Sequence, residues 1–205
     1  MKNAARDILR EMPAKIEDPF SDVKGMTSPR IKYLLNKLVG QLPPDEGYFE
    51  VGIHMGATLI GALAGHKTVD ATACDNWSQF EKLHNGSAKA FFFENIKRHQ
   101  DKLPPVRVID GNVWEFLKNP SFSKPLGLVF YDGDHKEEDQ RRIFSAIYPF
   151  LAREAIVLID DYEHPPVKAG TEAALKEMSC AKLEILIKPA KEGFHNGLGI
   201  FWLSK

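Results

Sequence analysis

The chain has 205 residues and a mass of 23.1 kDa, 43% of its residues are hydrophobic, and its formal net charge is -1. This size and apolar content favour one domain with a sizeable core, and the near-neutral charge argues against a nucleic-acid-binding protein that relies on a broad basic surface. No apolar run approaches the roughly 20 residues of a membrane span, the first residues lack the apolar core of a secretory signal, and there are only two cysteines. We therefore expect a cytoplasmic protein that does not associate with membranes.

Predicted helices and strands alternate along most of the chain. Residues 1–26 are mixed in character and predict a short N-terminal cap segment, which we separate from a main domain at residues 27–205. Ser28 and Pro29 mark the start of a helix with one apolar face. Apolar runs then predict strands at 48–51, 68–74, 106–109, 126–131 and 155–159. Helices are predicted at 58–64, 88–100, 113–117, 137–151 and 168–178.

The last two predicted strands, 183–187 and 198–203, have no helix between them and are most easily antiparallel. Five units of strand followed by helix, ending in such a hairpin, predict an α/β fold. We expect a doubly wound, seven-stranded, mostly parallel sheet of the Rossmann-like kind with a C-terminal antiparallel hairpin.

Carboxylates follow two of the predicted strands at the points where they end. They belong to Asp132, Asp134, Asp160 and Asp161. In an open parallel sheet, groups just past the carboxyl ends of the strands face the ligand crevice, so these side chains should converge. Crowded carboxylates repel one another, and a divalent cation with oxygen ligands would pair with them. The alternative is structural, with the aspartates forming a turn at Gly133 and capping the helices that follow.

The turn after the first strand distinguishes between cofactor classes. It contains Gly52 and Gly56 but lacks the third glycine of the dinucleotide-binding pattern. Glu50 at the strand end would repel a pyrophosphate and suits a ligand with a positive group, whereas Asp75 after the second strand can accept hydrogen bonds from both hydroxyls of a ribose. One carboxylate for a positive group and one for a ribose together suit S-adenosylmethionine. The plainer alternatives are that Glu50 only stabilises a turn and that Asp75 only caps a helix.

These motifs resemble those of class I S-adenosylmethionine-dependent methyltransferases, most closely the small metal-dependent O-methyltransferases of the macrocin and catechol types. The resemblance covers roughly residues 25–203 and rests on Glu50 to Gly56, Asp75, Asp132 to His135 and Asp160 to Tyr162. It implies that the cofactor is bound by Glu50, Gly52, Gly56, Asp75, Asn76, Trp77, Asn112 and Asp132. It also implies that Mg²⁺ is bound by Asp132, Asp160 and Asp161.

The resemblance further implies methyl transfer to a hydroxyl of a small-molecule acceptor. Asp134 is the favoured general base and His135 the second candidate. Other functions stay open: a metal-independent N- or C-methyltransferase, an NAD-dependent oxidoreductase, and a non-catalytic binding subunit. The sequence does not name the acceptor, which should be selected by residues 13–28, 77–92, 164–170 and 189–197. It also leaves a homo-oligomer open.

Overall fold

The computed structural model describes residues 3–79, 88–178, 181–187 and 193–205, with no side-chain description for 181–187. Seven strands form one sheet in the order β3-β2-β1-β4-β5-β7-β6. Their bounds are β1 Gly47–Val51, β2 Asp70–Asp75, β3 Val106–Asp110, β4 Leu126–Tyr131, β5 Leu151–Asp160, β6 Ala181–Ile187 and β7 Leu198–Ser204. Strands β1 to β5 pair in parallel, and β7 pairs antiparallel with both β5 and β6. The predicted fold class, including its C-terminal hairpin, is confirmed.

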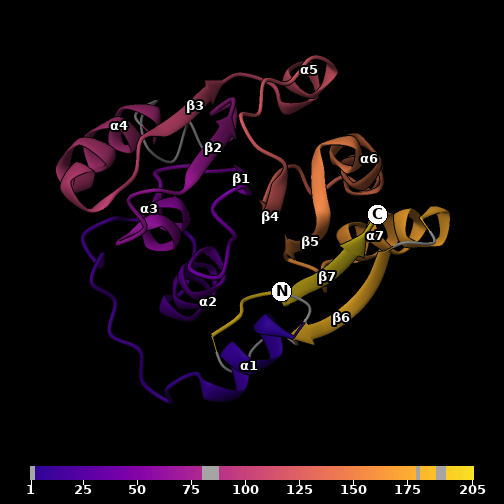
Figure 1. Cartoon of the computed structure of the whole chain (residues 1–205), viewed down its shortest axis with the longest axis horizontal. Helices are drawn as coiled ribbons and strands as arrows, with labels where there is room; N and C mark the ends of the chain where they lie inside the picture. The colour runs from indigo at the N-terminus through magenta and orange to yellow at the C-terminus, as the bar shows by residue number, and fades with distance from the viewer. Residues whose placement is uncertain (1–2, 80–87, 179–180, 188–192) are drawn as a thin grey trace.

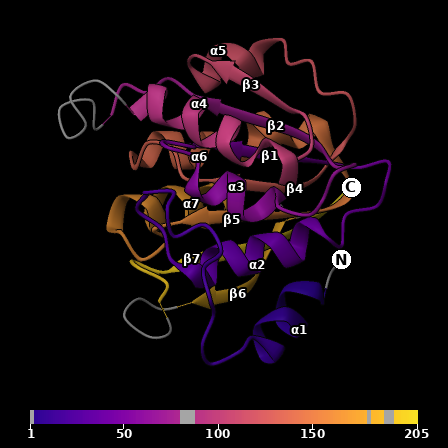
Figure 2. The ribbon, with the colours of Figure 1, turned by 90° about the vertical axis from the view of Figure 1, so that its left-hand side faces the viewer.

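Helices cover both faces of this sheet, as Figures 1 and 2 show. The helices are α1 Ala4–Glu11, α2 Pro29–Val39, α3 Ala57–Leu63, α4 Ala88–His99, α5 Val113–Lys118, α6 Glu137–Ile147 and α7 Pro165–Glu177. Helices α2, α3 and α4 lie on one side, and α5, α6 and α7 on the other. Side chains alternate between the two cores, because successive residues of a strand point to opposite faces. Tyr48 thus packs in the first core and Phe49 in the second.

Prolines shift three of the predicted boundaries. Helix α6 ends at Ile147, because residues 148–150 form a 3₁₀ turn that contains Pro149. Strand β5 consequently begins at Leu151, earlier than predicted. Helix α7 begins at Pro165, where the fixed φ of proline suits the first turn of a helix.

The N-terminal segment packs against the main body of the molecule. Phe20 and Val23 are buried in the core to which α2 and α4 also contribute. The largely buried Lys32 ammonium lies 2.5 Å from a carboxylate oxygen of Asp18. Residues 18–23 are therefore fixed in place, and they position residues 25–28 at the rim of the cavity described below.

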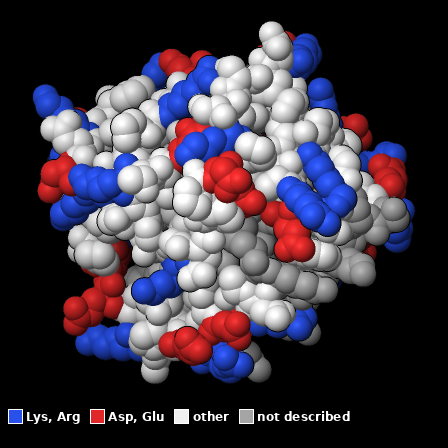
Figure 3. Space-filling view, viewed as in Figure 1, with Lys and Arg blue, Asp and Glu red and all other residues white. Residues whose placement is uncertain are grey.

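Acidic and basic side chains are interspersed on the surface. Among the described residues of the face in Figure 3, they form no continuous basic patch. In the part of the chain that the structure describes, no helix combines the length and apolar character needed to cross a membrane.

Candidate active site

A cavity of about 940 Å³ opens at the carboxyl ends of the central strands. The strand order reverses between β1 and β4, because β1 has β2 on one side and β4 on the other. Ligands of open α/β sheets bind outside the strand ends at such a reversal. The cavity is lined by Asp75 at the end of β2, by Asp132 after β4 and by Asp160 at the end of β5.

Glycine is required in the turn after β1 for two reasons. Gly52 has φ +85°, in the region that side chains disfavour, and an added Cβ would lie 1.8 Å from the carbonyl oxygen of Asp132. The amide of Asp132 in turn donates a hydrogen bond to the carbonyl of Val51 at 2.9 Å. Gly52 thus allows the ends of β1 and β4 to meet. Gly56 has φ +89° and precedes α3, and its own added Cβ would lie 3.1 Å from the Phe92 ring.

Glu50 lies behind this turn and does not line the cavity. Its fully buried carboxylate accepts hydrogen bonds from the Tyr48 hydroxyl and the Thr58 hydroxyl, each at 2.5 Å. Burial raises the pKa of Glu50 to about 7, although the hydrogen bonds from Thr58 and Tyr48 oppose this shift. Gly56 is likewise absent from the cavity wall, so of the cofactor-binding residues predicted at Glu50, Gly52 and Gly56 only Gly52 lines it.

Asp75 organises the cavity wall next to the first turn. One carboxylate oxygen accepts a hydrogen bond from the amide of His54 at 2.8 Å, and the other accepts one from the amide of Trp77 at 2.7 Å. The indole of Trp77 then donates to the carbonyl of His54 at 2.9 Å. Each carboxylate oxygen keeps a further lone pair, and Asp75 lines the cavity. It therefore joins two loops and can still bind a ligand.

The two predicted asparagines and a tryptophan form the next part of the wall. Asn76 accepts hydrogen bonds from the amide and hydroxyl of Ser78. Asn112 caps α5 by accepting a hydrogen bond from the amide of Trp114 at 2.8 Å. Trp114 also lines the cavity, and the guanidinium of Arg142 lies 4.5 Å from the centre of its ring. Trp114 was not predicted from the sequence, although an aromatic residue soon after the end of β3 could have indicated it.

Two of the four predicted carboxylates meet around His135. Nε2 of His135 lies 3.2 Å from Asp161 and 4.0 Å from Asp132. One potential ligand atom from each of these three residues lies within 4.8 Å of the others, a spacing that suits a metal ion. Burial raises the pKa of Asp132, as does the nearby charge of Asp161, while His135 opposes the shift. Asp132 and Asp161 in turn raise the pKa of His135.

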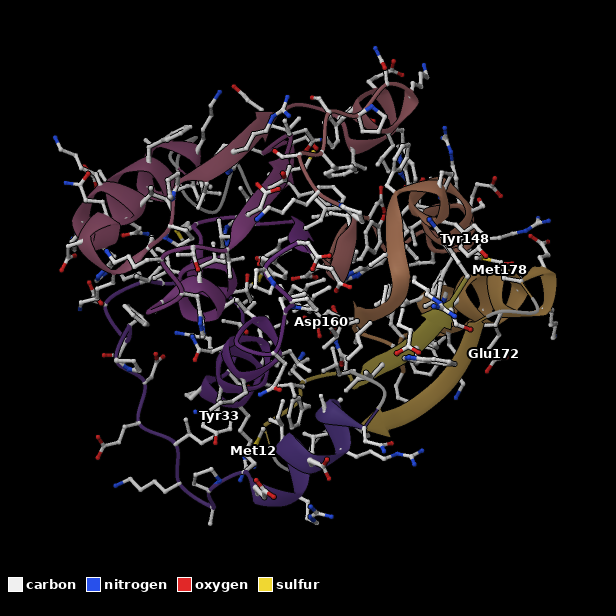
Figure 4. All side chains as sticks on the ribbon, viewed as in Figure 1. Met12, Tyr33, Tyr148, Asp160, Glu172 and Met178 are labelled. Atoms are coloured by element: carbon white, nitrogen blue, oxygen red, sulfur yellow. The ribbon has the colours of Figure 1, made fainter. Side chains whose placement is uncertain are left out.

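Asp160 lies beside this group without belonging to it. Its side chain is 8% exposed, and within the described part of the chain its buried Oδ1 atom has no hydrogen-bond partner. In Figure 4 it lies near the centre of the molecule, where β5 ends. Burial raises the pKa of Asp160 well above its usual range, and the charges of Asp132 and Asp161 raise it further. A cation would relieve this repulsion and satisfy the unpartnered oxygen.

Comparison with known proteins identifies the family. Residues 49–162, more than half of the chain, match a family described as a methyltransferase domain. The chain belongs to this methyltransferase family. The match begins in β1 and ends just after Asp161, so it spans every strand end that lines the cavity. No curated protein matches the chain.

Solved structures of methyltransferases share the fold of this one. A putative O-methyltransferase from Klebsiella pneumoniae aligns with a TM-score of 0.68 at 12% identity, covering 98% of this chain and 96% of that one. An O-methyltransferase from Bacillus cereus in complex with SAH aligns with a TM-score of 0.64 at 12% identity, covering 99% and 91%. A precorrin-6y C5,15-methyltransferase from Geobacter metallireducens aligns with a TM-score of 0.62 at 15% identity, covering 94% and 100%.

The two base candidates of this methyltransferase lie in different surroundings. Asp134 lines the cavity, but its carboxylate pairs with the Lys136 ammonium at 2.7 Å, and this contact lowers the pKa of Asp134. His135 instead lies among the carboxylates at the ends of β4 and β5. The pairing of Asp134 with Lys136 was not predicted from the sequence, although a lysine two residues away could have indicated it.

Proposed function

We propose that this protein is an S-adenosylmethionine-dependent O-methyltransferase that acts on a hydroxyl of a small molecule. The observation that carries the proposal is the convergence of Asp132, His135 and Asp161 in a cavity that Asp75 also lines. The first group suits an acceptor hydroxyl, and Asp75 suits a ribose. The fold shared with known O-methyltransferases supports this assignment.

The cofactor would lie along the ends of β1, β2 and β3. Asp75 would accept hydrogen bonds from the ribose hydroxyls, with Asn76 and Trp77 beside the adenosine and Asn112 at the adenine edge. Gly52 and Asp132 would border the methionine part. The remaining two predicted residues do not line the cavity and would act indirectly. Gly56 shapes the turn, and Glu50, when ionised, would supply negative charge near the cofactor's cationic groups. When bound, S-adenosylmethionine supplies a methyl group on a positively charged sulfur.

Asp132, Asp160 and Asp161 would hold Mg²⁺, an ion that lowers the pKa of a hydroxyl coordinated to it. The donor set fits, because Mg²⁺ prefers oxygen ligands and the buried Asp160 oxygen has no partner among the described residues. The aspartates would orient the acceptor oxygen toward the methyl group. Such positioning of two reactants supplies a large share of an enzyme's rate enhancement. We favour His135 over Asp134 as the group that accepts the hydroxyl proton, because Lys136 occupies Asp134; this role requires Nε2 of His135 to be released from Asp161.

Binding of S-adenosylhomocysteine tests the cofactor assignment. Calorimetry should show binding to the native protein and much weaker binding to Asp75→Ala. Asp110→Ala is the matched control, since Asp110 ends the neighbouring strand β3 but pairs with Lys89 outside the cavity. An absence of binding at millimolar ligand would remove the proposed function.

The metal assignment has a test of its own that does not require turnover. Calorimetric titration with Mg²⁺ should show one site in the native protein and none in Asp160→Asn, whereas Asp110→Asn should bind as the native protein does. Methyl transfer should also be lost with a chelator. Chelator-resistant transfer, with Asp160→Asn as active as the native protein, would remove Mg²⁺ while leaving the cofactor assignment intact.

A metal-independent transfer to nitrogen or carbon is the second candidate. One observation favours it: His135 already provides Asp161 with a partner at 3.2 Å, so part of the acidic group is balanced without a cation. The shared fold of the precorrin-6y C5,15-methyltransferase is compatible with it. An amine acceptor methylated equally fast with and without a chelator would establish this candidate.

A further inference from the structure

We propose that the acceptor carries no net negative charge: it is a neutral or cationic hydroxylated molecule, bound between residues 25–28 and residues 193–196. This inference rests on the proposed function, because the acceptor is the molecule that receives the methyl group. It follows from where these two segments lie and from the charges that line the cavity.

The two segments meet on the far side of the cavity from the ribose-binding wall. The amide of Glu163 donates to the carbonyl of Asn196 at 2.8 Å, which ties the loop before β7 to the residues that follow Asp161. An added Cβ at Gly193 would lie 3.8 Å from the side chain of Ser28, so this loop also touches the N-terminal segment. Strand β7 lies toward one end of the sheet, whereas β2 and β3 lie at the other (Figure 1).

The charges that line this cavity are predominantly negative. Among the described residues, its wall contains no lysine or arginine. Its acidic residues are Asp75, Asp132, Asp134, Asp139, Asp160 and Asp161. Two cations lie nearby. Lys136 pairs with Asp134, whereas Arg30, whose guanidinium donates to the sulfur of Met12 and the carbonyl of Ala14, keeps its charge but is not part of the cavity wall.

A bound cofactor and metal would not reverse this charge. S-adenosylmethionine carries one net positive charge, Mg²⁺ two and a protonated His135 one, whereas five aspartates remain when Asp134 is discounted because Lys136 neutralises it. A carboxylate or phosphate on the acceptor would therefore enter a negative field, with no lysine or arginine among the described residues of the wall to receive it, and like-charge contacts select against a ligand. A neutral or cationic acceptor meets no such barrier.

Thr27 provides a polar contact that suits an uncharged acceptor. Its hydroxyl oxygen is buried and, within the described part of the chain, has no hydrogen-bond partner. Thr27 lines the cavity between the exposed Met26, at 64%, and Ser28, whose hydroxyl already caps α2. A hydroxyl or amide of the acceptor can pair with Thr27, since a buried polar group favours a ligand that satisfies it. Thr27 is thus a specificity-determining residue.

Three matched catechol probes test the charge assignment in the presence of S-adenosylhomocysteine and Mg²⁺. They are 3,4-dihydroxybenzamide, 3,4-dihydroxybenzylamine and 3,4-dihydroxybenzoate, which are neutral, cationic and anionic. Calorimetry should show the amide and the amine binding at least tenfold more tightly than the carboxylate. Equal or tighter binding of the carboxylate would overturn the proposal. Loss of S-adenosylhomocysteine binding would instead refute the proposed function.

Two variants of Thr27 refine the result. Thr27→Val keeps the shape and removes the hydroxyl, so it should weaken binding of the amide severalfold while leaving the affinity for S-adenosylhomocysteine unchanged. Thr27→Arg adds the missing cation and should narrow or reverse the preference against the carboxylate. A Thr27→Arg protein that keeps the native preference, despite native S-adenosylhomocysteine binding, would contradict the placement of the acceptor beside residues 25–28.

Discussion

The two halves of the cavity are built in different ways. The half proposed for the cofactor consists of turns that directly follow β1, β2 and β3, where Asp75 bonds to two backbone amides and Asn112 caps the next helix. The half proposed for the acceptor combines strand ends with residues 25–28 and 193–196, which lie at opposite ends of the chain. Local turn chemistry therefore fixes the first half, whereas long-range packing determines the second.

The largest effect on stability and binding is expected from a substitution at Gly52, where the two halves of the cavity meet. Gly52→Ala would place a Cβ 1.8 Å from the Asp132 carbonyl, so β1 and β4 must separate and both halves should fail. We expect a loss of about 4 kcal/mol or more in the free energy of unfolding, measured with urea, and no binding of S-adenosylhomocysteine.

Gly65→Ala is the matched control for this substitution. Gly65 also has φ +85°, but an added Cβ would meet nothing within 4 Å. It should therefore cost only the backbone strain of about 1–2 kcal/mol. Equal losses for the two variants would show that the close approach of β1 and β4 contributes nothing.

The second largest effect is expected from Asp75→Ala, which should impair the cofactor half of the cavity alone. Asp75→Ala removes the acceptor of the His54 and Trp77 amides together with the proposed ribose contacts. We expect the affinity for S-adenosylhomocysteine to fall about 100-fold or more, which corresponds to two contacts to a charged group. Binding of Mg²⁺ should persist. A simultaneous loss of Mg²⁺ binding would show that the two halves are not separable.

The sequence predicted the fold and the strand ends because these depend on local patterns. Apolar runs located the strands, and the residues after them, Asp75 and Asp132, reached the cavity as expected. Side-chain direction was harder to predict. Asp161 has φ 50°, a conformation that aspartate tolerates without any sequence signal, and it joins the His135 group while its neighbour Asp160 does not.

Burial and contacts between distant segments could also not be predicted from the sequence. Glu50 was expected to line the cavity, but the pairing of Tyr48 and Thr58 with its carboxylate became visible only in the structure. The position of Thr27 depends on a contact between segments that are far apart in the sequence, around Ser28 and Gly193. Two of the acceptor-selecting stretches predicted above, 77–92 and 189–197, fall partly outside the described residues.

A smaller effect is expected from the ionisation of Glu50, which should make the cofactor affinity depend on pH. Its pKa is raised to about 7, so the carboxylate loses most of its charge below neutrality. If that charge favours the cationic cofactor, the affinity for S-adenosylmethionine should fall as pH decreases from 8 to 6, by about tenfold at pH 6. Glu50→Gln should bind more weakly at pH 8 and show a much flatter profile between these values. Identical profiles for the two proteins would exclude Glu50 from cofactor recognition.

Stability should change in the opposite sense over part of the same range. The folded protein holds the Glu50 proton up to about pH 7, whereas the unfolded chain releases it near the ordinary value of 4.5. The folded state therefore binds more protons between these two values, and the contribution of Glu50 to stability decreases as pH rises through this window. Urea unfolding of the native protein and Glu50→Gln at pH 5 and pH 7.5 should reveal the difference.

The smallest effect is expected at Asp134, and it separates the two base candidates. Lys136 pairs with Asp134 and lowers its pKa, so this carboxylate is a weak proton acceptor with a partner already in place. Asp134→Asn should change kcat less than about threefold, as is usual for a solvent-accessible ion pair. His135→Gln should lower kcat about 100-fold or more, in the range for a lost general base. The reverse order would assign the proton to Asp134 and leave His135 to balance Asp132 and Asp161.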